Sequence, residues 1–512
     1  MKKLVLLLCA STVGLLAQAP TVAAVYDAAQ AAVGIKDTTM CPGGLAAVYG
    51  TGFGSGAAST VVVTVGGQKA YVYPPTPTQV NVQLPFDLPV GSTTLTVTTG
   101  AGTSAPFNVT LSSVAPSILF APGSTSATSD GYITTATGVA ISNTNLANAG
   151  DTLVLYATGL GPTTPAVSPA AGPASSTVSL APLPTLTVGG AAAKVLFAGI
   201  GAGEAGVYQI NFTVPATVQG SVPVVLSIGG QSSNSVTLPL FGISSVVNAA
   251  SFLNTGTAAP EEMVSIFANG LGSANELTGI FPATSAQGVS VTINGVAATI
   301  IALAATGSQL NLIVPSETPA TGTVQVQLTT PAGKSLDFPL IMNQAVPGMF
   351  LITDPSNPAA QIATAQFANT IWLVLPTSTA VALQLPQNCT VSNANPLSYC
   401  GQPAAPGDYL VLYLTGLGEV TPKGNPNGTP LGTGVVAPAD GSTLYETTAT
   451  PTVQIGGVAA TVLFSGVAPG TAGEYQVDFQ VPTGVPEGDA VPILVSMPGS
   501  TTASATLAVH SR

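Results

Sequence analysis

The amino-acid sequence predicts an all-β protein built from four tandem β-sandwiches that are arranged as two pairs. Hydrophobic residues make up 46% of the 512 residues and charged residues only 5%, with 57 glycines and 43 prolines. Gly, Pro and β-branched residues together favour short strands joined by many turns. In addition, one glycine-containing phrase recurs four times, and each copy is followed by the same two strand patterns.

The recurring phrase has the form aromatic-x-x-Gly-apolar-Gly. Its four copies are "YGTGFG" at 49–54, "YATGLG" at 156–161, "FANGLG" at 267–272 and "YLTGLG" at 413–418. Each copy closes a strand, and in the fourth copy both faces of that strand are apolar, which is typical of a central, buried strand. The two glycines allow positive φ angles, so the chain can leave the sheet sharply.

Two further phrases complete each copy. A Gly-Gly or Asn-Gly pair between β-rich runs predicts a hairpin; it occurs in "VGGQKAYVY" at 65–73, "VGGAAAKVLF" at 188–197, "INGVAATII" at 293–301 and "IGGVAATVLF" at 455–464. Apolar residues at every second position predict a half-buried strand ended by proline; this strand is "QVNVQLP" at 79–85, "QINFTVP" at 209–215, "QLNLIVP" at 309–315 and "QVDFQVP" at 476–482. About seven short strands per copy indicate immunoglobulin-like (Ig-like) wiring.

The spacing of the phrases sets the expected domain boundaries. Copies of about 100 residues are long enough to bury a core of their own. The expected segments are a signal peptide at 1–24 and Ig-like domains at 25–112, 113–241, 242–343 and 344–512, the last with an insertion at 351–405. The second and fourth copies share a long hairpin, so the larger repeat is a pair, at 25–241 and 242–512.

The N-terminus has the pattern of a secretory signal. Two lysines precede the apolar run "LVLLLCASTVGLLA", and "AQA" at 17–19 is a small-x-small cleavage site. Pro20 would follow that cut, so cleavage after Ala23 or Ala24 is an open alternative. The run is too short for a membrane span, and Cys9 lacks a small-residue lipobox. We therefore expect a secreted or cell-surface protein, with the periplasm as an open alternative, and we expect 370–385 to form buried strand.

The charged residues and the cysteines indicate which partners and which cellular compartment to expect. The chain carries 8 Lys and Arg against 20 scattered Asp and Glu, which argues against a nucleic-acid partner because phosphate binding needs clustered basic residues. Cys389 and Cys400 bracket a polar segment and predict a disulfide in an exported protein. Cys41 is left over and is expected to be a buried free thiol.

The phrases in their order resemble a known type of domain. "EEMVSIFANGLG", then "INGVAAT", "LNLIVP" and "TVQVQLTTPAGKS" resemble the IPT/TIG type of Ig-like domain over nearly all of the mature chain. The combination "ISSVVNAASF", "YLTGLGEVTP" and "VQIGGVAATVLFSGVAPGTAGEYQVDFQVP" looks like a C-terminal module of uncharacterised secreted acidobacterial proteins. IPT/TIG domains occur in receptors, adhesins, polysaccharide-active enzymes and transcription factors, so the resemblance does not select a function.

A search for reaction chemistry gives no expected catalytic, cofactor or metal residue. His510 is the only histidine and lies third from the end, where a Ser-His-Asp arrangement would depend on a frayed terminus. Asp151 and Asp408 occupy equivalent turns, and Glu204 and Glu474 equivalent hairpins, which favours repeated turn hydrogen bonds over one active site.

The only acidic doublet, Glu261-Glu262, lies at the same turn as Asp151 and Asp408. The sequence has no calcium-binding loop of the Asp-x-Asp-x-Asp-Gly type. Calcium between domains would need three or more convergent oxygens, which the scattered acids do not obviously supply. Calcium at the domain joints therefore stays an open alternative.

A polar pair recurs on the third phrase of every copy. It consists of Gln79 with Asn81, Gln209 with Asn211, Gln309 with Asn311, and Gln476 with Asp478. A functional interpretation makes these residues a repeated ligand face. We favour a structural role in which they bond the backbone of a neighbouring loop, because most side-chain hydrogen bonds go to backbone or water.

Trp372 and Tyr399 are the best sequence candidates for contact with a ligand, since aromatic rings stack on sugars and anchor protein partners. A lone tryptophan in "TIWLVL" is nonetheless more often part of the core, so the core is the favoured place for Trp372. The sequence thus predicts an exported, non-enzymatic adhesion, scaffold or protein-binding module that binds an extracellular protein or glycan. The alternative is a carbohydrate-binding protein that uses loops of the fourth domain, and the third hypothesis is a polysaccharide hydrolase.

Overall fold

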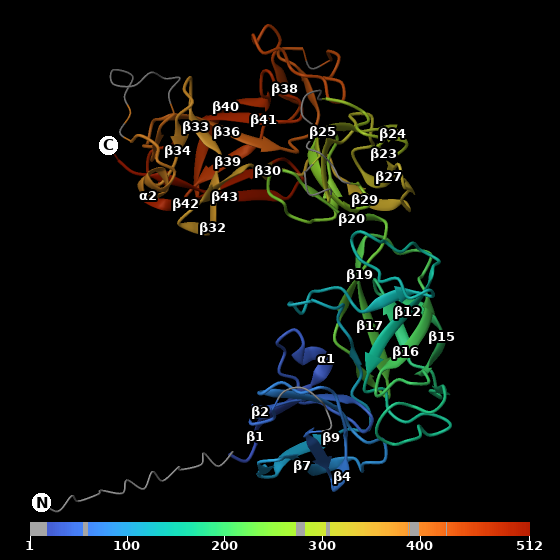
Figure 1. Ribbon diagram of the computed structural model, residues 1–512. Helices are drawn as coiled ribbons and strands as arrows, with labels where there is room; N and C mark the ends of the chain where they lie inside the picture. Colours follow the sequence, from blue (N-terminus) through green and yellow to red (C-terminus); the bar gives the residue numbers. More distant parts are fainter. Residues whose placement is uncertain are drawn as a thin grey trace, which may run out of the picture. The chain divides into compact units, whose positions relative to one another are not determined.

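The computed structural model describes residues 18–54, 60–272, 282–303, 308–387, 389, 399–425 and 427–511, and this part of the chain is almost entirely β. Its helices are α1 (Ala28–Ala31) and α2 (Thr377–Ala382), and neither is long and apolar enough to cross a membrane. The chain divides into two compact units between Leu240 and Phe241 (Figure 1), next to the pair boundary that the repeat predicts. We call them unit 1 and unit 2.

The first sandwich of unit 1 consists of two antiparallel sheets. One sheet has the order β1 (Thr21–Asp27), β2 (Leu45–Thr51), β6 (Gln79–Gln83), β5 (Tyr71–Val72). The other has the order β4 (Gln68–Lys69), β3 (Val62–Val65), β7 (Gly91–Thr99), β8 (Gly102–Thr103), with β9 (Phe107–Leu111) beside β7. Alternating apolar residues from both sheets, such as Val48 and Val97, form one core.

The second sandwich follows the path β10, β12, β16, β15, β14, β17, β18. The bounds are β10 (Ser117–Ile118), β11 (Ile133–Thr135), β12 (Thr152–Thr158), β13 (Val178–Ser179), β14 (Thr185–Val188), β15 (Ala191–Ile200), β16 (Tyr208–Thr213), β17 (Ser221–Ile228), β18 (Gln231–Ser232) and β19 (Val236–Pro239). Strand β15 pairs with β14 at its start and with β16 further on, so it joins the two layers.

The third sandwich, in unit 2, repeats the strand order of the first. One sheet has the order β20 (Gly242–Asn248), β22 (Met263–Asn269), β26 (Gln309–Ile313), β25 (Thr299–Leu303). The other has the order β21 (Thr257–Ala258), β29 (Phe338–Met342), β27 (Gly322–Thr330), β23 (Ser290–Ile293), β24 (Val296–Ala297), with β28 (Gly333–Lys334) beside β27.

The fourth sandwich has a path in which the long strand β40 pairs with both β39 and β41, as β15 does in unit 1. The bounds are β30 (Gly348–Met349), β31 (Leu351–Asp354), β32 (Asn357–Ala363), β33 (Ala365–Phe367), β34 (Leu373–Val374), β35 (Gly401–Gln402), β36 (Tyr409–Thr415), β37 (Val420–Pro422), β38 (Tyr445–Thr447), β39 (Thr452–Ile455), β40 (Val458–Val467), β41 (Tyr475–Gln480), β42 (Gly488–Ser496) and β43 (Thr502–Val509). The segment of the expected insertion contains β31–β35 and α2, and of these β33 has a counterpart in β11 of the second sandwich, since each pairs with the equivalent central strand in the same register. Within 370–385, strand is confirmed for Leu373–Val374, whereas Thr377–Ala382 is helical.

The repeated glycine phrase has the backbone that the sequence predicts. Its final two glycines have positive φ in all four copies, at 52 and 54, 159 and 161, 270 and 272, and 416 and 418. A second constraint appears only in the structure: a Cβ on Gly416 would lie 2.1 Å from the carbonyl oxygen of Val346. The corresponding Cβ on Gly159 would lie 1.9 Å from the carbonyl oxygen of Ala115. The phrase therefore lets two chain segments touch through their backbones.

The start of the first sandwich differs from the expected boundary at residue 25. Strand β1 begins at Thr21, and its residues 21–27 pair with β2, so the sandwich includes residues that we had placed in the signal peptide. Cleavage after Ala23 or Ala24 would remove paired residues, whereas cleavage after Ala19 would leave β1 whole. The apolar run of the expected signal, residues 4–17, lies outside the described residues.

Candidate functional site

A buried threonine joins the two sandwiches of each unit. In unit 2, Thr415 Oγ1 accepts a hydrogen bond of 2.8 Å from the backbone N–H of Met263 and donates one of 2.9 Å to the carbonyl of Gly473. In unit 1 the same roles fall to Thr158, Leu45 and Gly206. Both threonine side chains are fully buried, so the contact holds each pair of sandwiches at a fixed junction.

Beside this junction, unit 2 has a pocket of about 540 Å³ between its two sandwiches, which we call the unit 2 pocket. The third sandwich contributes Glu261, Glu317 and Thr318 to its wall. The fourth contributes Glu419 and apolar residues, among which are Leu417, Leu431 and Met497. The pocket therefore combines an apolar wall with three carboxyl groups.

Glu261 has the least ordinary environment of these residues. Its φ is +62°, a left-handed conformation that costs a non-glycine residue about 1–2 kcal/mol. The residue is only 6% exposed, and its Oε2 atom has no hydrogen-bond partner. Burial, followed by the negative charge of Glu419, raises the pKa of Glu261 to about 8. Hydrogen bonds to the carboxyl from Tyr475 and from the backbone N–H of Val420 oppose this rise. The Tyr475 hydroxyl also donates to the Gly418 carbonyl at 2.6 Å.

Thr318 adds a second unsatisfied group to the same wall. It is 3% exposed, and its Oγ1 atom also lacks a hydrogen-bond partner. The described residues contain four buried side-chain polar atoms of this kind, and two of them line the unit 2 pocket. Because a buried polar atom without a partner is costly, two such atoms at one pocket indicate a place where a ligand supplies the missing contacts.

A loop of the fourth sandwich borders the pocket. This loop, residues 423–444, connects β37 to β38 and contains Leu431 and Thr433. Thr433 Oγ1 accepts a hydrogen bond of 2.7 Å from the backbone N–H of Ser316 and donates one of 3.0 Å to Glu317 Oε2. Bonding from its own backbone N–H, and then from Thr433, lowers the pKa of Glu317. Glu317 and Glu419 are exposed, so two acids lie at the entrance and one buried acid lies inside.

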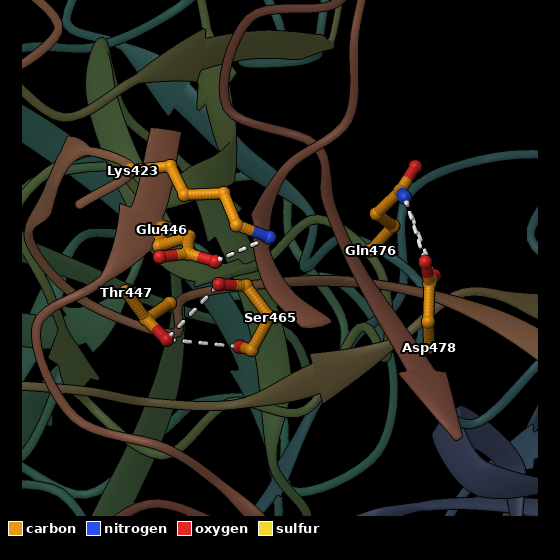
Figure 2. A network of polar contacts seen from close by, with 6 residues as sticks. All are labelled: Lys423, Glu446, Thr447, Ser465, Gln476 and Asp478. Atoms are coloured by element: carbon orange, nitrogen blue, oxygen red, sulfur yellow. Dashed lines mark hydrogen bonds and ion pairs between the residues drawn. The ribbon is translucent and has the colours of Figure 1, made fainter. Parts of the chain in front are cut away.

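Polar contacts fix the hairpin that carries this loop. Lys423 Nζ lies 3.1 Å from Glu446 Oε1, so the first residue of the loop is paired with strand β38, as drawn in Figure 2. Figure 2 also shows Thr447 Oγ1 donating to Ser465 Oγ at 2.9 Å, which ties β38 to β40. The loop therefore starts and ends on a bonded framework.

The equivalent place in unit 1 is filled. Repeat alignment matches Glu261, Ser316 and Thr318 with Gly43, Phe86 and Leu88. A Cβ on Gly43 would lie 2.1 Å from a ring carbon of Phe86, so the phenyl ring occupies the volume that the Glu261 side chain takes in unit 2. Phe86 also packs against the core of the second sandwich. Unit 1 thus has an apolar plug where unit 2 has acidic and hydroxyl groups.

The neighbouring acid, Glu262, has a structural role. It is fully buried and accepts hydrogen bonds from the backbone N–H of Ala259 at 2.7 Å and from Asn248 Nδ2 at 2.8 Å. Burial raises its pKa to about 8. Asp151 and Asp408 accept the same backbone bond in their copies, at 2.8 and 2.7 Å. The predicted turn hydrogen bonds are therefore present.

The repeated polar pairs have partners other than those predicted. We expected bonds to the backbone of a neighbouring loop, but each glutamine donates to the side chain two positions further along its own strand. The distances are 2.9 Å for Gln79–Asn81, 2.8 Å for Gln209–Asn211, 2.9 Å for Gln309–Asn311 and 3.2 Å for Gln476–Asp478. The last pair is drawn in Figure 2. Alternate residues of a strand share a face, which explains the geometry.

The two aromatic candidates lie in different environments. Trp372 is 5% exposed and belongs to the core of the fourth sandwich, so its ring cannot stack on a ligand at the surface. Tyr399 is 67% exposed. The predicted disulfide joins Cys389 and Cys400, whose Cα atoms are 6.5 Å apart, and Cys41 is a buried free thiol as expected.

The remaining candidates do not assemble a second site. His510 Nε2 lies 2.8 Å from Asp489 Oδ1, and both side chains are exposed. Burial raises the pKa of Glu474, while Glu204 occupies the equivalent hairpin of unit 1. Among the described residues, no group of three or more His, Cys, Asp or Glu side chains is arranged to hold a metal ion.

The unit 2 pocket was missed at the level of sequence, although a signal for it exists. The position before the turn acid is Gly150 in the second copy, Gly407 in the fourth and Glu261 in the third. In the first copy, where Gly44 replaces the acid, it is Gly43, and all three glycines have positive φ. A charged residue at a position that favours glycine indicates a role other than folding. Glu317 and Glu419 carry no such signal, because exposed acids are common.

Comparisons with known proteins return remote structural matches. No protein-family model and no curated protein sequence matches the chain. Among solved structures, the plexin A4 extracellular region is 9% identical over 96% of this chain, with a TM-score of 0.24, and the chain spans 30% of its length. The I9–I11 tandem of titin is 9% identical and aligns over 72% of this chain and 95% of its own, with a TM-score of 0.13.

A third match is SGBP-B from a complex xyloglucan utilization locus in Bacteroides uniformis. It is 11% identical, covers 63% of this chain and 96% of its own length, and has a TM-score of 0.17. At these values we take neither ligand nor activity from the matches. The Ig-like fold rests on the strand order above, and membership of the IPT/TIG type stays a prediction.

Proposed function

We propose that the protein is an exported, non-enzymatic protein-binding module and that its ligand enters the unit 2 pocket. The observation that carries this proposal is the pair of buried, unpartnered atoms, Glu261 Oε2 and Thr318 Oγ1, in the wall of one pocket. Such atoms are costly without a partner, and the strained backbone at Glu261 adds to that cost. In unit 1 the equivalent residues are Gly43 and Leu88, which have neither the strained backbone nor an unpartnered polar atom. The fold itself therefore does not require Glu261 and Thr318.

Export and the IPT/TIG relationship are part of the proposal. The disulfide between Cys389 and Cys400 supports an oxidising compartment, such as the outside of the cell, because cytosolic thiols stay reduced. Each unit holds its two sandwiches through a buried threonine, which suits a scaffold that presents a preformed site.

A plugged variant tests the proposal without breaking the fold. Glu261→Gly, Ser316→Phe and Thr318→Leu together copy the residues that fill unit 1, so we expect a folded protein without the pocket. The immobilised mature chain and this variant are exposed to extracellular protein, and the bound partner is crosslinked and mapped. Crosslinks to residues 423–444 that disappear in the plugged variant support the proposal. Equal binding by both proteins contradicts it.

One observation favours an enzyme as the second candidate. A buried acid with a raised pKa, Glu261, beside an acid with a lowered pKa, Glu317, is the combination that glycoside hydrolases use. The same two proteins are therefore incubated with polysaccharides while reducing ends are counted. Hydrolysis that is lost in Glu261→Gln overturns the binding proposal. The carbohydrate-binding alternative is favoured if glycans bind saturably without being hydrolysed and if the plugged variant loses that binding. The glycan site would then be the unit 2 pocket and would not involve Trp372.

A further inference from the structure

The charge of the unit 2 pocket restricts what it can bind. Its wall contains Glu261, Glu317 and Glu419, and none of its described lining residues is Lys, Arg or His. Acidic groups at the entrance without a basic one repel anions and attract cations, and the buried Glu261 carboxyl becomes charged when a cation displaces its proton. The exposed pair, Glu317 and Glu419, gives the entrance a negative potential that would draw a positive group inward.

The unpartnered polar atoms inside the pocket match a ligand group that donates hydrogen bonds. Glu261 Oε2 and Thr318 Oγ1 are both able to accept hydrogen bonds, and both lack a partner. An ammonium group carries three donors, which is enough in number for both atoms. Bonds between an ammonium and a carboxylate are among the stronger hydrogen bonds in proteins.

The remaining wall fits an alkyl chain rather than a bare ion. Leu417, Leu431 and Met497 are each at most 6% exposed and line the pocket together with Ala345. Within the described residues, the carboxylates form no group arranged to hold a metal ion. A long apolar stem with an ammonium at its end matches both features, since lysine side chains bury their stems and direct their charge to polar groups.

We infer that the unit 2 pocket binds the side chain of a lysine presented by the protein partner, with the ammonium at Glu261 and Thr318 and the stem along Leu417, Leu431 and Met497. This inference rests on the proposed function, because it names the group that enters the proposed site. Unit 1 is not expected to bind lysine, since Phe86 and Leu88 occupy the corresponding positions.

Binding in this way is coupled to proton release. The unliganded Glu261 carboxyl holds its proton up to about pH 8, and it is faced by Glu419 and Tyr475 of the fourth sandwich and by Glu317 of the third. An ammonium favours the ionised carboxylate, while lysine itself stays charged to about pH 10. The affinity should therefore rise between pH 6 and pH 8, by up to about tenfold per pH unit.

The test uses the full chain and the probe Nα-acetyl-lysine methylamide, followed by calorimetry in two buffers of different ionisation enthalpy. We expect saturable binding with proton release at pH 7, and affinity weakened at least about tenfold in Glu261→Gln. The matched control is Asp87→Asn, because Asp87 is the unit 1 equivalent of Glu317 and should leave binding unchanged. Equal affinity for the norleucine analogue, or binding unaffected by Glu261→Gln, overturns the inference.

The outcome separates the inference from the proposed function. If a protein partner is lost in the plugged variant but the lysine probe neither binds nor competes with it, the pocket is the binding site and the lysine assignment is wrong. If the partner binds the plugged variant as well as the wild type, the proposed function fails. Competition by the lysine probe, together with loss of the partner after acetylation of the partner's lysines, supports both.

Discussion

Thr415 Oγ1 lies 2.8 Å from the backbone nitrogen of Met263, a residue 152 positions earlier in the sequence, and accepts its hydrogen bond. The same hydroxyl donates to Gly473, so one side chain satisfies a donor of the third sandwich and an acceptor of its own. The threonine of unit 1 makes the equivalent two bonds. A pair of sandwiches, rather than a single one, is therefore the unit that the repeat copies.

Thr415→Val should destabilise unit 2 by about 1–3 kcal/mol, because it leaves the buried N–H of Met263 without an acceptor. The free energy of unfolding is measured by chemical denaturation. Thr323→Val, at an exposed strand position, is the control and should change it by less than about 0.5 kcal/mol. A similar effect of both substitutions would show that the junction does not depend on this hydroxyl.

Gly416→Ala should cost about 2–4 kcal/mol, because the new methyl would lie 2.1 Å from the Val346 carbonyl in addition to the strain of positive φ. Gly457→Ala separates the two contributions. Gly457 also has positive φ, but a Cβ there meets nothing within 4 Å, so a loss of about 1 kcal/mol is expected. Equal losses in the two variants would contradict the close backbone approach.

Glu261→Gly should stabilise unit 2 by about 1–2 kcal/mol, because glycine adopts positive φ without strain and the buried Oε2 atom that lacks a partner is removed. The change is measured by denaturation near pH 7. A loss of stability would mean that the carboxyl has partners in the folded state, which would contradict a ligand at this position.

The stability of unit 2 should decrease as the pH rises from about 4.5 to about 8. Glu261 and Glu262 keep their protons in the folded state up to about pH 8, whereas the unfolded chain loses them near 4.5. The unfolded state therefore binds fewer protons over this range, and each group contributes a decrease of about 1.4 kcal/mol per pH unit. Asp478, whose pKa is raised to about 6, also lowers the stability of unit 2 as the pH rises, but only to about pH 6. Asp27 has the same effect on unit 1.

The pH dependence is checked by comparing Glu261→Gln with the wild type between pH 6 and 8. Over that interval the slope of the unfolding free energy against pH should fall by about half, since Glu262 still titrates. An unchanged slope would show that Glu261 ionises normally in the folded protein.

Trp372→Ala should lower the stability of the fourth sandwich by about 3–5 kcal/mol through loss of core packing. It should not remove a ligand contact, because the ring is buried. Since Trp372 is the only tryptophan, its fluorescence in the wild type also reports unfolding of this sandwich. Loss of binding in a variant that remains fully stable would place the ring in a ligand site after all.

Particular residues show which structural features could be predicted from the sequence. The positive φ angles of the glycine phrase, the Cys389–Cys400 disulfide and the buried Cys41 were predicted, because a turn, a close cysteine pair and an apolar thiol depend on local pattern and composition. For Trp372 the sequence favoured the core but kept a ligand contact as a candidate, since a strand pattern does not say whether an aromatic ring faces core or solvent. The prediction of hydrogen-bond partners for Gln79 and its equivalents was wrong. The recurrence of a polar pair in every copy fits a bond to a neighbouring loop and a bond to the next residue on the same strand face equally well.

The sequence by itself determined the all-β class, the repeat and its pairing, because alternating apolar residues and glycines at turns act over a few positions of the chain. Only the tertiary structure decided where a ligand could enter. Glu261, Glu317, Glu419 and Leu431 come from separate segments of two sandwiches and meet only when the junction at Thr415 forms. The difference between an open pocket and a filled one also depends on Phe86, whose ring occupies in unit 1 the volume that Glu261 takes in unit 2.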